Sequence, residues 1–125
     1  MTATAQTVAI LGASADPERY AFKAQRLLKE QGHHVVPISA KEASIDGDRT
    51  VPAIAELLAG AIDTLTVYVR PSVSSQFRED ILRVAPRRVI FNPGTENPDL
   101  EKDLRAAGID CRDACTLVML RSVHF

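Results

Sequence analysis

Several kinds of residue are scarce in this 125-residue chain, and each scarcity excludes a class of protein. Tryptophan is absent and aromatic residues make up 5% of the chain, which argues against a nucleic-acid platform built from stacked rings. The net charge is -1, so the chain has no bulk attraction to nucleic acid or to an anionic membrane. No apolar run approaches the roughly 20 residues of a membrane span. We therefore expect neither nucleic acid nor a membrane as a partner.

Cysteine is scarce too, with only Cys111 and Cys115 present. Their C-x-x-x-C spacing is neither a disulfide framework nor a zinc-binding pattern, so a reducing cytoplasm is the simplest location. Residues 1–6 lack the basic region and apolar segment of a signal peptide, and we expect them to form a frayed terminus. The length predicts one domain over residues 1–125.

Patterns of catalytic or metal-binding residues are also missing. His33 and His34 are adjacent at the start of a predicted strand, so they point to opposite faces and make a poor metal pair. There is no serine elbow and no pair of carboxylates with acid–base spacing. No histidine lies near Cys111 or Cys115 in the sequence to act as a base. We predict no catalytic residue and no metal site, and therefore a protein that is not an enzyme.

What the chain does contain is an alternation of apolar strands and amphipathic helices. Strands are predicted at residues 8–11, 34–38, 62–69, 88–91 and 109–112. Helices are predicted at residues 17–31, 51–58, 73–84 and 98–106, with caps at Asp16, Ser72 and Asn97. A short strand or turn is expected at residues 45–47, and residues 116–120 form either a helix turn or an edge segment.

This alternation predicts an α/β fold, a Rossmann-like three-layer sandwich. Its five-stranded parallel sheet has the order 3-2-1-4-5, with helices on both faces. The flavodoxin-like order 2-1-3-4-5 is the alternative.

Ligands of such sheets bind beyond the carboxyl ends of the strands. Four of these ends are predicted here: Gly12-Ala13-Ser14, Ser39-Ala40-Lys41, Val69-Arg70-Pro71 and Asn92-Pro93-Gly94. The first precedes a helix, so its glycine turn and the helix dipole favour an anion. None of the four is an acidic cluster, which disfavours a bare divalent cation.

The first turn is an incomplete dinucleotide fingerprint. Only Gly12 of the G-x-G-x-x-G pattern is present, and Lys41 follows the second strand where a ribose-binding acid is expected. An ammonium group suits a phosphate, so a ligand with an extra phosphate on its ribose is favoured over NAD. NADP and coenzyme A both meet this description.

Four segments together carry a family resemblance: G-A-S-x-x-P-x-R at residues 12–19, Tyr20-Ala21-Phe22-Lys23, Val69-Arg70-Pro71, and Phe91-Asn92-Pro93-Gly94 followed by Glu96. In these segments the chain resembles the small stand-alone CoA-binding proteins, which are similar to the CoA-binding domain of the succinyl-CoA synthetase alpha subunit. The resemblance covers about residues 7–121. It implies a Rossmann-like domain that binds coenzyme A at the carboxyl ends of strands one to four, with any reaction left to other domains.

The resemblance also implies a role for each strand end. Backbone N–H groups of Gly12, Ala13 and Ser14 would face the pyrophosphate, with positive charge from Arg19 and Lys23 and with Tyr20 between them. The segment Ser39, Ala40 and Lys41 would lie by the adenosine, with Lys41 near the 3′-phosphate. The segment Val69, Arg70 and Pro71 would form the adenine-side wall, and Asn92, Pro93 and Gly94 would approach the pantetheine arm. Many relatives have an Asn-Pro pair in place of Ser39-Ala40-Lys41, and some have Gln-x-Gly in place of Asn92-Pro93-Gly94.

Each of these assignments has a purely structural alternative. Arg19 and Lys41 could be solvated charges, Lys23 could cover its helix with its aliphatic stem, and Asn92-Pro93-Gly94 could be an ordinary turn. The function we expect is non-catalytic binding of coenzyme A or an acyl-CoA. The alternatives are an NADP- or CoA-dependent enzyme completed at a dimer interface, and a flavodoxin-like domain that binds a protein. The apolar run 116–120 would need cover, which favours a homodimer.

Overall fold

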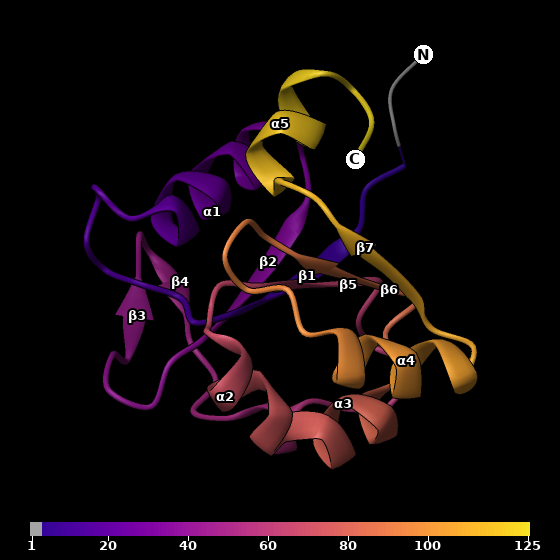
Figure 1. Cartoon of the computed structure of the whole chain (residues 1–125). Helices are drawn as coiled ribbons and strands as arrows, with labels where there is room; N and C mark the ends of the chain where they lie inside the picture. The colour runs from indigo at the N-terminus through magenta and orange to yellow at the C-terminus, as the bar shows by residue number, and fades with distance from the viewer. Residues whose placement is uncertain (1–3) are drawn as a thin grey trace.

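The computed structural model describes residues 4–125 as a parallel sheet with helices on both of its faces (Figure 1). Its elements are, in chain order, β1 (Thr7–Leu11), α1 (Tyr20–Glu30), β2 (His34–Ile38), β3 (Ser44–Ile45), β4 (Asp48–Arg49), a 3-10 turn (Ile54–Glu56), β5 (Thr64–Val67), α2 (Pro71–Ser74), a second 3-10 turn (Ser75–Phe77), α3 (Arg78–Val84), β6 (Arg88–Phe91), α4 (Pro98–Ala106), β7 (Asp110–Asp113) and α5 (Thr116–Arg121).

The main sheet has five parallel strands in the order β2-β1-β5-β6-β7. Beyond β2, Val51 forms a single parallel bridge with Ile38, so a rudimentary strand occupies that edge. When the Val51 bridge is counted as the third strand, the order from this edge to β6 follows the predicted Rossmann-like 3-2-1-4-5 pattern. Strand β7 then adds a sixth position beyond β6. The five full strands alone read 2-1-3-4-5, because the strand predicted at 62–69 pairs with β1. The α/β fold class, the parallel sheet and the two helical layers are confirmed.

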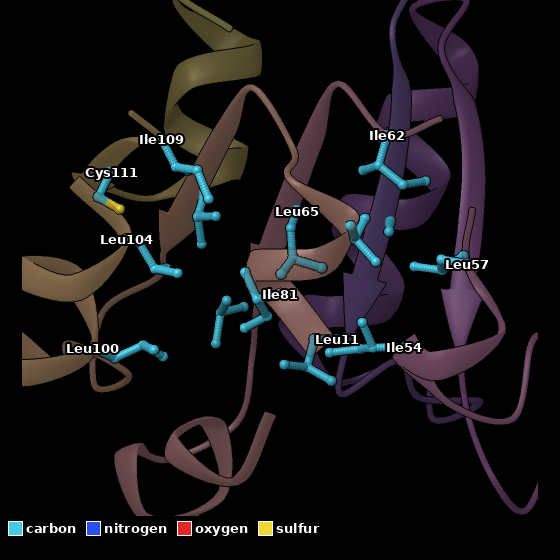
Figure 2. Close-up of a cluster of buried hydrophobic side chains, with 14 of the residues drawn as sticks. Leu11, Ile54, Leu57, Ile62, Leu65, Ile81, Leu100, Leu104, Ile109 and Cys111 are labelled. Carbon is cyan, nitrogen blue, oxygen red and sulfur yellow. The ribbon is translucent and has the colours of Figure 1, made fainter. Parts of the chain in front are cut away.

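Two hydrophobic clusters lie on the two faces of the sheet. Helices α1 and α5 cover the smaller cluster, in which Ile10, Leu28 and Leu120 are at most 2% exposed. Helices α3 and α4 and the first 3-10 turn cover the larger one, where the side chains converge on the sheet (Figure 2). Both faces of β5 are therefore covered, and all four of its residues are buried, including Thr64 and Thr66.

Helix α1 begins later than the Asp16-Pro17 signal predicts. The Oδ1 atom of Asp16 accepts the Glu18 N–H at 3.0 Å, and its carbonyl accepts the Arg19 N–H at 3.0 Å, so this pair makes a turn. The helix starts at Tyr20, whose side chain is 69% exposed. The predicted end is confirmed, with Gly32 at a φ of 89° just beyond it.

The helix predicted at 51–58 is wrong, because this segment forms only the 3-10 turn. Val51 is held against β2 instead: its N–H donates to the Pro37 carbonyl at 3.0 Å, and its carbonyl accepts the Ser39 N–H at 2.9 Å. This pairing keeps the start of the segment extended. Ile54 and Leu57 still enter the core.

The helix predicted at 73–84 is present but begins earlier, at Pro71. Arg70 is its N-cap residue, so the predicted cap at Ser72 is wrong. The second 3-10 turn separates α2 from α3. Helix α4 begins as predicted: the Oδ1 atom of Asn97 accepts the Leu100 N–H at 3.2 Å.

The two ends of the described chain are both anchored. Residues 1–3 lie outside the described part, but Gln6 is not frayed as predicted, because its N–H donates to Nδ1 of His33 at 3.0 Å. Residues 116–120 form a helix, α5, and four of its residues are buried within the chain. Val118 in this helix is 58% exposed, and the homodimer stays a prediction. Within residues 4–125, no helix is long and apolar enough to cross a membrane.

Candidate functional site

Three adjoining hollows form a groove along the carboxyl edge of the sheet. The central hollow, of about 610 Å³, lies between the loop after β1, the start of α1 and the residues that follow β5 and β6. Its lining residues are Gly12, Ser14, Asp16, Arg19, Tyr20, Ala21, Lys41, Tyr68, Val69, Pro93 and Thr95. Seven of them are predicted site residues, so the structure brings much of the predicted site together at one edge.

The loop after β1 presents free backbone donors to this hollow. With the described residues, the N–H groups of Gly12, Ala13, Ser14 and Ala15 form no hydrogen bond. The next N–H, of Asp16, donates to the Ser14 hydroxyl at 3.1 Å. Successive unpaired N–H groups beside the start of an eleven-residue helix favour an anionic group, as predicted for this turn.

Gly12 allows β5 to approach this loop closely. Its φ is 88°, and a Cβ atom there would lie 2.8 Å from Cγ1 of Val69 and 3.1 Å from the carbonyl carbon of Tyr68. At the other five glycines, all in the described part of the chain, a Cβ would meet nothing within 4 Å. Any side chain at Gly12 would therefore displace the end of β5 from the loop.

A second hollow, of about 390 Å³, continues the groove past the end of β2. It is lined by Ser39, Ala40, Lys41, Glu42, Ala43, Arg49, Thr50 and Pro52, and it shares Lys41 with the central hollow. The Ser39 hydroxyl shapes this turn by accepting the Glu42 N–H at 3.1 Å. The Lys41 side chain is exposed and forms no ion pair with any residue in 4–125. It is placed to meet an anionic ligand group at this end.

The other predicted cations are placed differently from one another. The guanidinium of Arg19 lies in the central hollow, 4.0 Å from the Asp16 carboxylate and 75% exposed, so this ion pair is weak. Lys23 lies instead on the α5 side of α1, in a separate hollow with Arg26 and Arg121. Arg70 is exposed at the start of α2 and, like Pro71, does not line the groove. The structure therefore separates Lys23 from the predicted anion site.

The amide of Asn92 bonds within the protein. Its Nδ2 donates to the Thr66 hydroxyl at 2.7 Å and to the Val67 carbonyl at 2.9 Å. Its Oδ1 accepts the Thr116 N–H at 2.9 Å, so β5, β6 and α5 meet on this side chain. Pro93 faces the groove, while the Gly94 N–H donates to Oε1 of Glu96 at 2.9 Å.

A third hollow, of about 350 Å³, ends the groove beside α5; it contains the predicted site residues Tyr20, Asn92 and Pro93, and sequence reasoning missed the other five residues that line it. It is lined by Tyr20, Tyr68, Asn92, Pro93, Cys115, Leu117, Val118 and Arg121. Burial raises the pKa of Tyr68 to about 12, and its hydroxyl has no hydrogen-bond partner among residues 4–125. No local pattern identifies Tyr68 or the residues from Cys115 to Arg121, because α5 reaches Tyr20 and Tyr68 only through the fold.

The groove has few groups suited to acid–base or nucleophilic chemistry. Cys115 lines the third hollow, whereas Cys111 lies in the core, where burial raises the pKa of its thiol to about 11 and makes it a poor nucleophile. His33 and His34 lie at the opposite, amino-terminal edge of the sheet, where β2 begins. Within the described chain, no three His, Cys, Asp or Glu side chains gather in a way that could hold a metal ion. The arrangement is suited to holding an extended anionic molecule.

A Rossmann-like domain with an anion-binding loop at its sheet edge is the class of protein that these features define. A family model described as a CoA binding domain matches residues 6–121, so the chain belongs to that family.

Solved structures agree with this assignment. An uncharacterized protein of known crystal structure shares 36% sequence identity and a TM-score of 0.92, over 98% of this chain and 100% of that chain. The protein cell-free ID.343 from Thermus thermophilus shares 32% identity and a TM-score of 0.86, over 97% of this chain and 91% of that one.

A larger enzyme contains the same fold as one part. The dinucleotide forming acetyl-coenzyme A synthetase 1 of Ca. Korarchaeum cryptofilum shares 18% identity and a TM-score of 0.72, over 87% of this chain but only 25% of that one. At this identity the likeness shows the fold alone.

Proposed function

We propose that the protein binds coenzyme A or an acyl-CoA in the carboxyl-edge groove and carries out no chemistry on it. The observation that carries this proposal is the run of unpaired N–H groups from Gly12 to Ala15, which is suited to a pyrophosphate. Lys41 on one side and the apolar third hollow on the other suit a ligand with a phosphorylated nucleoside at one end and an uncharged arm at the other. Coenzyme A has this order of groups.

The experiment is calorimetric titration with CoA, 3′-dephospho-CoA, NAD and NADP at one fixed salt concentration. We expect CoA to bind, and 3′-dephospho-CoA to bind about tenfold more weakly, because it lacks the phosphate that Lys41 would meet through a charge-assisted hydrogen bond. Binding of NADP alone would overturn the proposal in favour of an NADP-dependent enzyme. Binding of none of the four would favour a domain that recognises a protein partner.

Two variants and a matched control identify the residues that contribute. Lys41→Ala is expected to make CoA and 3′-dephospho-CoA bind alike, and Arg19→Ala to weaken both. Lys23→Ala is the control, because this lysine lines a hollow that shares no residue with the central hollow. If Lys23→Ala weakens binding more than Lys41→Ala does, the ligand does not lie along the groove as proposed.

The non-catalytic part of the proposal has its own test. Incubation of the protein with acetyl-CoA, followed by chromatography, is expected to leave the thioester intact at the rate of the buffer alone. Release of free CoA above that rate would contradict the proposal and favour the CoA-dependent enzyme.

A further inference from the structure

The third hollow lies at the end of the groove opposite to Lys41, between the start of α1, the residues after β6, and α5. It shares Tyr20, Tyr68 and Pro93 with the central hollow, so the two are continuous. A ligand with its pyrophosphate at residues 12–15 and its nucleoside near Lys41 would point its other end toward this hollow. The proposed function does not say which chemical group the ligand carries at that end.

The walls of the third hollow are largely apolar. The amide of Asn92, a polar group at its base, has both N–H bonds and its oxygen used inside the protein. Leu117 and Val118 come from α5, and the Cys115 thiol packs as a small apolar group. The polar groups left for a ligand are the Arg121 guanidinium at one side and the Tyr68 hydroxyl, which has no partner among residues 4–125.

The rim of this hollow exposes apolar surface to solvent. Four large hydrophobic side chains in the described chain are strongly exposed, and two of them, Tyr20 at 69% and Val118 at 58%, line this hollow. Exposed apolar surface that gathers at a hollow is typical of a binding surface. The other two, Leu58 and Val123, line none of the three hollows of the groove.

We propose that the third hollow receives the acyl group of an acyl-CoA, and that this group is a short, uncharged aliphatic chain. This inference rests on the proposed function, because the acyl group reaches the hollow only if the nucleotide end is held at residues 12–15. The acyl carbons pack against Leu117, Val118 and the ring of Tyr20, and Pro93 separates the hollow from the pyrophosphate site.

The test is a titration series with CoA, acetyl-CoA, butyryl-CoA and succinyl-CoA under reducing conditions. Each methylene that becomes fully buried is expected to tighten binding about fourfold. Butyryl-CoA has two more methylenes than acetyl-CoA, so it is expected to bind at least about tenfold more tightly. Succinyl-CoA has the same chain length as butyryl-CoA but ends in a carboxylate, and it is expected to lose this gain. A preference for succinyl-CoA over butyryl-CoA would overturn the inference that the acyl chain is uncharged.

Val118→Asn adds polarity at the rim without changing a buried residue, and it is expected to remove the difference between butyryl-CoA and acetyl-CoA. Leu58→Asn is the matched control, because Leu58 is also exposed but lies outside the groove. The alternative occupant of this apolar surface is a second copy of the chain, and sedimentation of both variants measures whether they self-associate. If Val118→Asn converts a dimer into a monomer and leaves the acyl preference unchanged, the hollow serves self-association and the inference is wrong.

Failure of the inference is distinguishable from failure of the proposed function. If CoA binds and all its thioesters bind with the same affinity, the acyl site is overturned and the CoA site stands. If CoA itself does not bind, both are overturned.

Discussion

At the scale of single residues, both the backbone conformation and the close surroundings of Gly12 disfavour a Cβ atom at this position. A side chain there would have to adopt a φ of 88° and would also contact Val69 and the Tyr68 backbone. Gly12→Ala is therefore expected to lower the free energy of unfolding by about 1–3 kcal/mol from backbone strain, with a further loss from overpacking. Denaturant unfolding of the variant measures the total.

Gly32→Ala is the control for this prediction. Gly32 has a φ of 89° but open space where a Cβ would lie, so its variant reports the backbone strain alone. We expect Gly12→Ala to cost at least about 1 kcal/mol more than Gly32→Ala, because only the first overpacks its surroundings. Equal losses would show that the close approach of β5 has no energetic consequence.

His33 makes the stability of the protein depend on pH. Its ring is 8% exposed, packs against Phe125 and accepts the Gln6 N–H at Nδ1. Burial, and secondarily the Arg88 charge, lower the pKa of His33 below its usual value of about 6.5. Below that pH the unfolded chain binds the proton more readily than the folded one, so stability is expected to fall as pH drops below about 6.5.

Urea unfolding between pH 5 and pH 8 measures this effect. His33→Gln is expected to flatten the pH dependence, whatever its effect on stability at pH 8. His34→Gln is the matched control, because the neighbouring ring is exposed. If the pH dependence persists in His33→Gln and disappears in His34→Gln, then His34 causes it and the prediction is wrong.

At the scale of elements, the position of α5 depends on one side chain of the loop after β6. Asn92→Ala would leave the Thr116 N–H without its partner beneath α5, and a buried donor without a partner costs about 1–3 kcal/mol. We expect faster amide hydrogen exchange over Thr116–Arg121 together with a lower free energy of unfolding. Asn92→Asp keeps the acceptor for Thr116 and is expected to protect α5 better than Asn92→Ala does. Unchanged exchange in both variants would mean that packing alone holds the helix.

A second element-scale feature fixes the β3–β4 hairpin against α1. Nζ of Lys29 lies 3.0 Å from the Asp46 carboxylate and 2.8 Å from that of Asp48, and Arg26 bonds Asp46 at 2.9 Å. Arg26 and Lys29 together lower the pKa of the Asp46 carboxyl. The hairpin follows the Lys41 turn directly in the chain, so these contacts hold one end of the groove in place.

At the scale of the whole molecule, sequence reasoning predicted the fold class because the signals for strands are local and repeated. Runs such as Val8 to Leu11 and Val89 to Phe91 are apolar and short, and turn residues follow them. The strand ends could be predicted for the same reason, so much of the candidate groove follows from the chain alone. Which strand lies beside which is decided by long-range pairing. The bridge from Val51 to Ile38 has no local signature.

The errors have a common physical cause, since each concerns where a group points or what pairs with it across the fold. Asp16 carries a helix-capping signal, yet its carboxylate closes a turn. For Lys23 and Asn92 the binding roles stay predictions, but the sequence does not show that Lys23 lines a different hollow from Arg19 or that the Asn92 amide bonds within the protein. Residues 51–58 have helical periodicity that pairing with β2 overrides. Only tertiary contacts decide these orientations.

Both edges of the main sheet resist the addition of a further strand. At the β2 edge, Val51 occupies the Pro37 carbonyl and the Ser39 N–H, and Pro37 has no N–H to offer. At the β7 edge, Asp110, Arg112 and Asp113 are exposed charges on a four-residue strand. Short, charged or proline-containing edges suppress the sheet-to-sheet joining that leads to fibrils. A chain built on five aligned strands can therefore accumulate to high concentration in its native state without the sheets of neighbouring molecules joining edge to edge.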